Sequence, residues 1–393
     1  MTVMQTKQSA KINLDDILSY GNDTEMISFA GGFPDPKLFP EAALKQAYLD
    51  AINEDGQAIF QYHTAQGDLD LRQRLADRMR SHCQVATNAD DVMLTQGGQQ
   101  AISLIAQMLL TPGDGVVVEA PTYLGALDVF NRYQPHYYEV PMDESGMDVD
   151  QLASLLANHP EIKLIYTVPD FQNPTGATLS SIKRQRIAEL AAKYQVVVLE
   201  DSPYRDLSYN GSVPPAIKHF DQAGQVIFVS SFSKILSPAL RTGWVVANQR
   251  YLKALISLKG ASDLQSPQIS LRAINQFLSH QDIDVHIAQL RSVYREKRDT
   301  MLAAIDRYFP KNVIYTKPKG GFFIWATLPV GIDAGALLAD VAVPQNHIAY
   351  VPACCEFAIP VHNNGMRLSF VGCSPAEITR GIKRLGEMLT KLV

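Results

Sequence analysis

The chain has 393 residues, 46% of them hydrophobic, and a formal net charge of -5. That length is more than one ordinary core serves, so we expect two domains. The balance of 35 basic against 40 acidic residues gives no electrostatic footprint for nucleic acid or an anionic membrane. The N-terminal run has no apolar core of a signal peptide, and no stretch approaches 18 uninterrupted apolar residues. We therefore expect a soluble cytoplasmic protein.

The cysteines follow no metal-binding or disulfide pattern; they are Cys83, Cys354, Cys355 and Cys373. Neither a CxxC pair nor a histidine cluster accompanies them, so we expect no structural zinc ion, no other metal and no disulfide framework. We interpret the adjacent Cys354 and Cys355 as reduced residues of a pocket or of the core.

The N-terminal part predicts a short helix over 14–20, an extended segment over 26–30 and a helix from Pro40 to Leu49. Gly31 and Gly32 interrupt the chain between the last two elements. The glycine pair fits a plain turn, and it fits equally a place where backbone approaches a ligand closely.

An alternation of strands and helices begins after Tyr62, a loop residue in the run QYHTAQG that on its own indicates only an anchored surface tyrosine. A strand predicted over 92–95 leads through Gly98 and Gln99 into a helix over 101–110. A glycine turn at a helix N-terminus offers free amides and a positive dipole end to an anion, although many such turns bind nothing.

Two buried strands, predicted over 116–119 and 164–168, are each followed by a candidate binding residue. Tyr123 would open a helix at the carboxyl edge of the sheet, where its ring either stacks on a flat ligand or packs on the core. Asn173 precedes a proline, which holds the asparagine extended and fixes the direction of its side chain.

The next strand, predicted over 196–199 after a helix over 182–193, leads directly into Asp201 and Tyr204. An acidic residue at this point fits a helix cap or a surface charge. It also fits a ligand contact, because doubly wound sheets bind their ligands at the carboxyl ends of their strands.

One lysine, Lys234, follows the strand predicted over 226–229 in the run SSFSKILSPALRTGW. Most lysines near strand ends are solvated, but a buried ammonium group is costly unless something uses it. A desolvated amine is a good nucleophile towards carbonyls, as in Schiff-base lysines. Ser231, Ser233 and Arg241 offer the neutral donors and the planar cation that a phosphate monoester needs. The stretch therefore indicates pyridoxal phosphate, an aldehyde cofactor that carries a phosphate.

Towards the C-terminus, the pattern predicts one long helix over 269–301, a glycine-opened strand over 319–325 and a capped amphipathic helix over 374–393. Arg367 interrupts an otherwise apolar strand over 366–370. An arginine there is costly unless it meets a carboxylate, which favours a binding role.

A pyridoxal cofactor needs an amine for its aldehyde, a carboxylate for its ring nitrogen and donors for its phenolate oxygen. It also needs a ring to stack on, a phosphate cradle and an anchor for the substrate carboxylate. The candidates for these roles are, in that order, Lys234, Asp201, the pair Asn173 and Tyr204, Tyr123, the cradle of Gly98, Gln99, Ser231, Ser233 and Arg241, and Arg367.

Several long motifs stand in the order of one family: FAGGFPDP, PTYLGALDVF, DFQNPTGATLS, EDSPYRDL, SFSKILSPALRTGW, PKGGFFIW and MRLSF. From about Asp15 to the C-terminus, the chain resembles a fold-type I pyridoxal-phosphate-dependent aminotransferase of class I/II. Within that class it is similar to the group that holds 2-aminoadipate and broad-specificity aromatic and branched-chain aminotransferases.

The resemblance implies an α/β fold, with a mostly parallel seven-stranded sheet between helices in a large domain and a smaller α/β C-terminal domain. We expect the large domain over 51–285 and the small one over 286–393. The N-terminal segment, residues 1–50, is expected to become part of the small domain. The resemblance also implies a homodimer, in which Tyr62 reaches the phosphate of the neighbouring subunit. The catalytic residues that it implies are Lys234, Asp201 and Tyr123, and the substrate-binding residues are Arg367, Asn173 and Gly32.

The implied reaction is ping-pong transfer of an amino group from an L-amino acid to a 2-oxo acid. Members acting on 2-aminoadipate tend to carry a cation in the N-terminal helix, where this chain has Asp15 and Asp16. We therefore predict a preference for apolar or aromatic side chains. Ala353 stands where relatives usually have glycine, which puts the shape of the substrate pocket in doubt.

Two other functions stay open on this sequence. The same carbanion chemistry would serve a C–S β-lyase on the same fold. A non-catalytic sensor that retains pyridoxal phosphate is the second, since transcription regulators carry the same core behind an N-terminal winged helix. The run before residue 11 offers no room for that module, which favours a free-standing enzyme.

Overall fold

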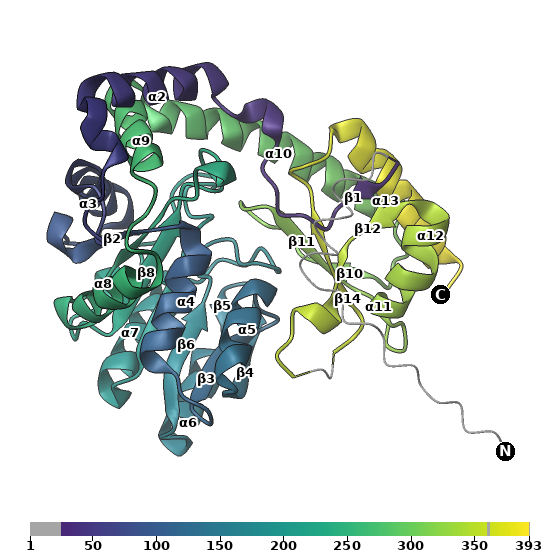
Figure 1. Ribbon diagram of the computed structural model, residues 1–393. Helices are drawn as coiled ribbons and strands as arrows, with labels where there is room; N and C mark the ends of the chain where they lie inside the picture. Colours follow the sequence, from purple (N-terminus) through teal and green to yellow (C-terminus); the bar gives the residue numbers. More distant parts are fainter. Residues whose placement is uncertain (1–24, 360–361, 393) are drawn as a thin grey trace.

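The computed structural model of the chain describes residues 25–359 and 362–392 (Figure 1). A large mixed sheet has eight strands in the order β2-β9-β8-β7-β6-β3-β4-β5. Five neighbouring strands, from β8 to β4, run parallel, whereas β9 is antiparallel to both of its neighbours. The strands are β2 (Val92–Thr95), β3 (Gly115–Ala120), β4 (His136–Asp143), β5 (Gly146–Met147), β6 (Ile162–Thr167), β7 (Val197–Asp201), β8 (Val226–Ser231) and β9 (Gly243–Val246).

The mostly parallel large sheet is thus as expected, with one short strand more than the seven we anticipated. That strand, β5, has two residues and pairs antiparallel with the end of β4 across a tight turn. The turn depends on Gly146, which adopts a φ of +96° that side chains rarely tolerate.

Helices cover both faces of the large sheet, because its inner strands are apolar on both sides. Val117, Ile165 and Val198 pack with α6 and α7 on one face. Their sequence neighbours, Val116 and Leu199 among them, pack on the opposite face with α3, α4, α5, α8 and α9. These helices are α3 (Leu69–Cys83), α4 (Gly97–Leu109), α5 (Leu124–Phe130), α6 (Val149–Asn158), α7 (Ser181–Tyr194), α8 (Gln249–Asp263) and α9 (Gln268–His280).

A smaller antiparallel sheet, in the order β10-β11-β14-β13, lies beside the first (Figure 1). The N-terminal segment joins this C-terminal part, since β1 pairs parallel with β12 and the Ser369 amide donates to the carbonyl of Phe29. Helix α10 runs from the helices beside the large sheet to α13, against which it packs. The elements are β1 (Ile27–Ser28), α2 (Glu41–Asp55), α10 (Ile283–Tyr308), β10 (Ile314–Tyr315), β11 (Phe323–Thr327), α11 (Ala334–Leu337), α12 (Val343–Asn346), β12 (Ile348–Ala349), β13 (Val351–Pro352), β14 (Gly365–Ser369) and α13 (Pro375–Thr390).

The prediction of one long helix over 269–301 was wrong. The chain breaks after α9, and Asp282 caps the N-terminus of α10 by accepting a hydrogen bond from the Asp284 amide. An aspartate competes with the helical backbone for that amide, which favours a new helix start over continuation. The helix predicted over 14–20, with Asp15 and Asp16, lies outside the described residues. None of the helices in the described ranges has the length and apolar character to cross a membrane.

Candidate active site

A cavity of about 250 Å³ lies at the carboxyl edge of the large sheet, where it faces the smaller sheet and the N-terminal segment. Strand ends, the start of α4, the loop after β8 and β14 all contribute to its lining. Every predicted site residue except Tyr62 lines this cavity: Gly32, Gly98, Gln99, Tyr123, Asn173, Asp201, Tyr204, Ser231, Ser233, Lys234, Arg241 and Arg367. Among the described residues, no group of acidic, histidine and cysteine side chains is arranged to hold a metal ion.

The Lys234 amine is held in the cavity without a carboxylate partner among the described residues. Its Nζ atom donates a hydrogen bond to the carbonyl oxygen of Gly32 at 2.9 Å. Burial, followed by the positive charges of Arg367 and Arg241, lowers the pKa of Lys234 to about 8, against the opposing charge of Asp201. A substantial fraction of this amine is therefore neutral near physiological pH, as a nucleophile requires.

Gly32 is needed where it stands because a side chain would not fit. A Cβ atom there would lie 2.8 Å from the Phe323 ring. The close approach at Gly32 is thus to a side chain of the protein, and approach of this backbone to a ligand stays a prediction.

Asp201 ends β7 and turns its carboxylate towards the cavity, whereas its neighbour Glu200 points the other way. The Tyr166 hydroxyl donates to the Asp201 Oδ2 atom at 2.9 Å. Burial raises the pKa of Asp201 to about 6, while the Tyr166 hydrogen bond and Lys234 oppose the rise. Glu200 instead accepts from the backbone amides of Ile217 and Lys218, so it is a structural cap.

An anion cradle forms where the N-terminus of α4 meets Arg241. The first turn of this 13-residue helix presents backbone amides and the positive end of its dipole. Gly97 has a φ of +78°, and a Cβ atom there would lie 2.8 Å from an Arg241 guanidinium nitrogen. Among the described residues, that guanidinium hydrogen-bonds only to the backbone carbonyls of Gln96 and Pro238, so its charge is available to a ligand.

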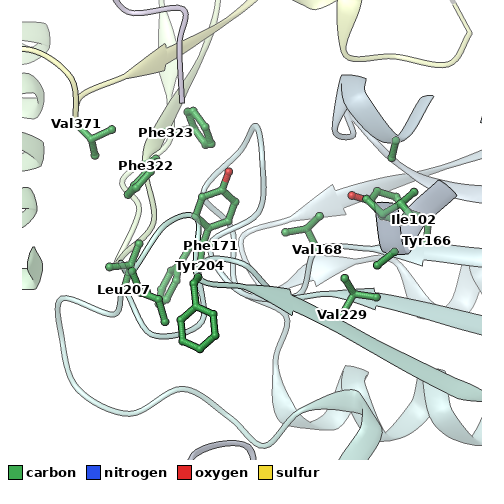
Figure 2. Close-up of a cluster of buried hydrophobic side chains, with 14 of the residues drawn as sticks. Ile102, Tyr166, Val168, Phe171, Tyr204, Leu207, Val229, Phe322, Phe323 and Val371 are labelled. Carbon is green, nitrogen blue, oxygen red and sulfur yellow. The ribbon is translucent and has the colours of Figure 1, made fainter. Parts of the chain in front are cut away.

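Tyr123, Tyr204 and Asn173 form part of the cavity walls. Tyr123 caps α5, and its hydroxyl lies 3.5 Å from the Gln99 side-chain oxygen. Tyr204 is buried against the rings of Phe322 and Phe323, whose centroids lie 5.4 and 5.8 Å from its own (Figure 2). Figure 2 also shows Tyr166 on the sheet side of this cluster, nearer Ile102 than the loop rings.

Arg367 already meets a carboxylate of the protein itself. Its Nη1 atom donates to Asn173 Oδ1 and to Glu356 Oε1, both at 2.8 Å, and Nη2 donates to the Ala30 carbonyl at 2.7 Å. The guanidinium lies over the Phe323 ring, 4.5 Å from its centroid. The carboxylate that this arginine was predicted to need is thus supplied, in this structure, by Glu356 of the same chain. The sequence analysis did not identify Glu356.

Comparison with known proteins agrees with this geometry. The sequence profile described as "Aminotransferase class I and II" matches residues 24–385. The chain belongs to this family.

The aminotransferase resembles characterised relatives over almost its whole length. It is 38% identical to aromatic-amino-acid aminotransferase 1 of Thermococcus litoralis, over 95% of this chain and 90% of that protein. It superimposes with a TM-score of 0.92 on a kynurenine aminotransferase of Pyrococcus horikoshii solved with PMP, at 35% identity over 99% and 98% of the two chains. The alpha-aminoadipate aminotransferase of Thermus thermophilus, complexed with N-(5'-phosphopyridoxyl)-L-leucine, gives 0.89 at 32% identity, over 98% and 96%.

These findings make the protein a pyridoxal-phosphate-dependent aminotransferase that acts on an amino acid and a 2-oxo acid. The cavity of the aminotransferase fits that cofactor. A side chain at Gly97 would fill the anion cradle, and the Lys234 amine lies in the same cavity as the cradle. An aldehyde and a phosphate on one ligand therefore find their complements within one space.

Tyr62 lies outside the aminotransferase cavity. Its side chain is 74% exposed, on a segment whose His63 amide donates to the Gln265 side chain. Phe60 and Leu264, on the same two segments, are also exposed.

Proposed function

We propose that this aminotransferase attaches pyridoxal phosphate through the Lys234 amine and grips the carboxylate of its substrates with Arg367. The observation that carries the proposal is the shared cavity, whose lining includes both residues. The cofactor, when bound, supplies the aldehyde that takes the amino group and a ring that delocalises negative charge from the substrate α-carbon.

In this proposal Lys234 moves the proton of the substrate α-carbon, since an amine with a pKa of about 8 works as a base near neutral pH. The negative charge of Asp201 keeps the ring nitrogen protonated, and a low-dielectric setting strengthens that interaction. Gly98, Gln99, Ser231, Ser233 and Arg241 would hold the phosphate, and Tyr123 would offer a ring for stacking.

Asn173 and Tyr204 serve as donors to the phenolate oxygen of the cofactor. The amide orientation of Asn173 supports this role, because its oxygen accepts from Arg367 and its NH₂ group is left to donate. Asn173 thereby links the cofactor to the residue that grips the substrate.

Amino acid and 2-oxo acid bind in turn at the same place, because both carry a carboxylate attached directly to the reacting α-carbon. This single anchor supports a ping-pong mechanism. The residue range 51–285 would form the cofactor-binding domain. Residues 286–393, with the segment up to residue 50, would form the domain that contributes Arg367 and Gly32 to the substrate.

Apolar or aromatic side chains are the preferred substrates. The cavity lining is rich in apolar groups, with Phe33, Ile102, Leu124, Val168 and Phe323. Each basic residue in that lining already has a cofactor or carboxylate role, which leaves no cation for a distal carboxylate among the lining residues that the structure describes. The relative named for aromatic amino acids and the one named for kynurenine support the same preference.

The working unit in this proposal is a homodimer. Its support is the exposed segment of Tyr62, since a tyrosine that lies outside the cavity of its own chain remains free to reach the phosphate of a partner. Alanine at Tyr62 is then expected to weaken cofactor retention without changing the charge of the site.

A donor and acceptor panel tests the function. The purified holoenzyme is given single L-amino acids with 2-oxobutanoate as a common acceptor, and the 2-aminobutanoate that forms is quantified. We expect phenylalanine, tyrosine and leucine to exceed glutamate and 2-aminoadipate in kcat/KM. A wide margin in favour of glutamate or 2-aminoadipate would reject the substrate preference, and ammonia with pyruvate as the products would reject transfer in favour of elimination.

A further inference from the structure

Glu356 places a buried carboxylate on the arginine that the proposed function assigns to the substrate carboxylate. It directly follows the short 3-10 turn Ala353–Cys355 and is fully buried. Its Oε1 atom accepts from Arg367 at 2.8 Å, whereas its Oε2 atom is buried without a hydrogen-bond partner among the described residues. The backbone around it is tied down, because Glu356 donates its amide to Ala353 and accepts from the Thr122 amide.

A substrate would bring a second carboxylate to the same guanidinium. Arg367 retains a donor for it, since Nη2 carries two hydrogens and, within the described part of the chain, gives only one of them to the Ala30 carbonyl. Two anions on one cation in a dry site are nevertheless costly, because the second negative charge is not compensated. Binding is cheaper if one of the two carboxylates carries a proton.

Glu356 is suited to take that proton. The groups that face it are Arg367 from β14, Cys354 and Cys355 from the preceding turn, and Tyr204 beside the cavity. Burial, with a smaller contribution from Cys354, raises the pKa of Glu356 to about 8, against the charge of Arg367. Because Oε2 has no partner, a proton there breaks no hydrogen bond and leaves the Oε1 bond to Arg367 in place.

We propose that Glu356 is a proton gate, which takes up one proton when the carboxylate of an amino acid or 2-oxo acid reaches Arg367. This inference rests on the proposed role of Arg367. The ionised form of Glu356 leaves Arg367 neutralised and repels the substrate carboxylate.

The gate predicts how affinity depends on pH. A group with a pKa near 8 is about nine-tenths protonated at pH 7 and about one-tenth at pH 9. Since apparent affinity scales with the competent fraction, a carboxylate ligand should bind about ten-fold more weakly at pH 9 than at pH 7. Ligands without a carboxylate should not show this loss.

The test uses 3-phenylpropanoate, a monocarboxylate that lacks an amino group and cannot be turned over. Its Kd is measured on the holoenzyme between pH 6.5 and pH 9.5 by cofactor absorbance. Calorimetry in two buffers of different ionisation enthalpy gives the protons taken up on binding. For the wild type we expect uptake close to one proton at pH 9 and little at pH 6.5.

Glu356→Gln supplies the comparison, because glutamine imitates the neutral acid. The cofactor-bearing lysine can also exchange protons, but both proteins share it, so the difference between them reports Glu356. We expect the variant to lose about one proton of uptake at pH 9 and to bind about ten-fold more tightly than wild type there. Glu139→Gln is the matched control. Glu139 accepts hydrogen bonds from the amides of Ala358 and Ile359, so this substitution removes an acid behind the same loop. Its pH profile should follow the wild type.

Arg367→Ala separates failure of the gate from failure of the proposed function. If that variant loses the ligand while Glu356→Gln keeps the wild-type pH profile and proton uptake, the gate is wrong and the role of Arg367 stands. If Arg367→Ala binds the ligand as well as wild type, the carboxylate site itself is misassigned. Wild-type binding without proton uptake at pH 9 would overturn the gate even if Glu356→Gln did not fold.

Discussion

The hydrogen bond from the Lys234 amine to the Gly32 carbonyl, at 2.9 Å, joins the loop after a central strand of the large sheet to the N-terminal segment. Gly32 also packs against the Phe323 ring of the smaller sheet. The amine that we assign to the cofactor is therefore oriented by a part of the chain that also borders the substrate side of the cavity. Cofactor and substrate sites share one wall.

The lowered pKa of Lys234 predicts the pH dependence of cofactor capture by the apoenzyme. Only the neutral amine attacks an aldehyde, and the folded pKa of about 8 lies below the usual value for lysine. The capture rate, followed by absorbance, should rise between pH 6.5 and pH 8 and level off above pH 9. A rate that still climbs about ten-fold per unit beyond pH 9 would show an unperturbed amine.

Asp201 and Glu200 are adjacent acids that face opposite ways, which makes them a matched pair. Asp201→Asn removes the charge that faces the ring, so kcat should fall by about 100-fold or more while the cofactor stays attached to Lys234. Glu200→Gln should retain turnover and lower the free energy of unfolding by about 1–3 kcal/mol, because two buried amides then lack a full acceptor. Equal kinetic losses in both variants would contradict the assignment.

Gly97→Ala should damage the phosphate cradle without touching a charged group. The new Cβ atom would press on the Arg241 guanidinium in a backbone conformation that alanine rarely adopts. We expect the Kd of pyridoxal phosphate to rise at least about ten-fold, measured by equilibrium dialysis after removal of the cofactor. Gly260→Ala is the control, since its Cβ meets only Ala65, at an ordinary 3.7 Å. Similar cofactor affinities of the two variants would remove the argument for the cradle.

Breaking the buried Arg367–Glu356 pair from one side should destabilise the fold. Arg367→Met leaves Glu356 without its cation, at a cost of about 3–5 kcal/mol above the pKa of the acid. The cost should shrink towards pH 6, because the raised pKa lets Glu356 become neutral. Arg367→Met with Glu356→Leu should recover most of the loss in chemical denaturation. An unchanged loss in the double variant would show that the pair is not what the fold depends on.

Several cavity residues were predictable because they follow a buried strand or a glycine turn, as Asn173 and Lys234 do, whereas Arg367 was recognisable as a charge inside an apolar strand. Strand ends converge at one edge of such a sheet, so the strand pattern alone was enough to place Asp201 and Lys234 together. The family profile and the relatives then confirmed the cofactor and the fold.

The contacts that depend on register could not be predicted. Glu356 meets Arg367 because β13 pairs antiparallel with β14, with Val351 opposite Arg367, and a short turn then returns the acid to the guanidinium. Tyr166 reaches Asp201 only through the pairing of β6 with β7. The break between α9 and α10 carried a readable signal in Asp282, but the apolar period continued across it.

The role of Lys234 is tested most sharply by covalent attachment of the cofactor. Holoenzyme is reduced with borohydride, digested and analysed by mass spectrometry, with Lys234→Ala and the exposed Lys193→Ala carried through in parallel. We expect a phosphopyridoxyl mass on the peptide that contains Lys234, in the wild type and in Lys193→Ala, and neither label nor turnover in Lys234→Ala. A label on another lysine, or normal turnover by Lys234→Ala, would contradict this role of Lys234.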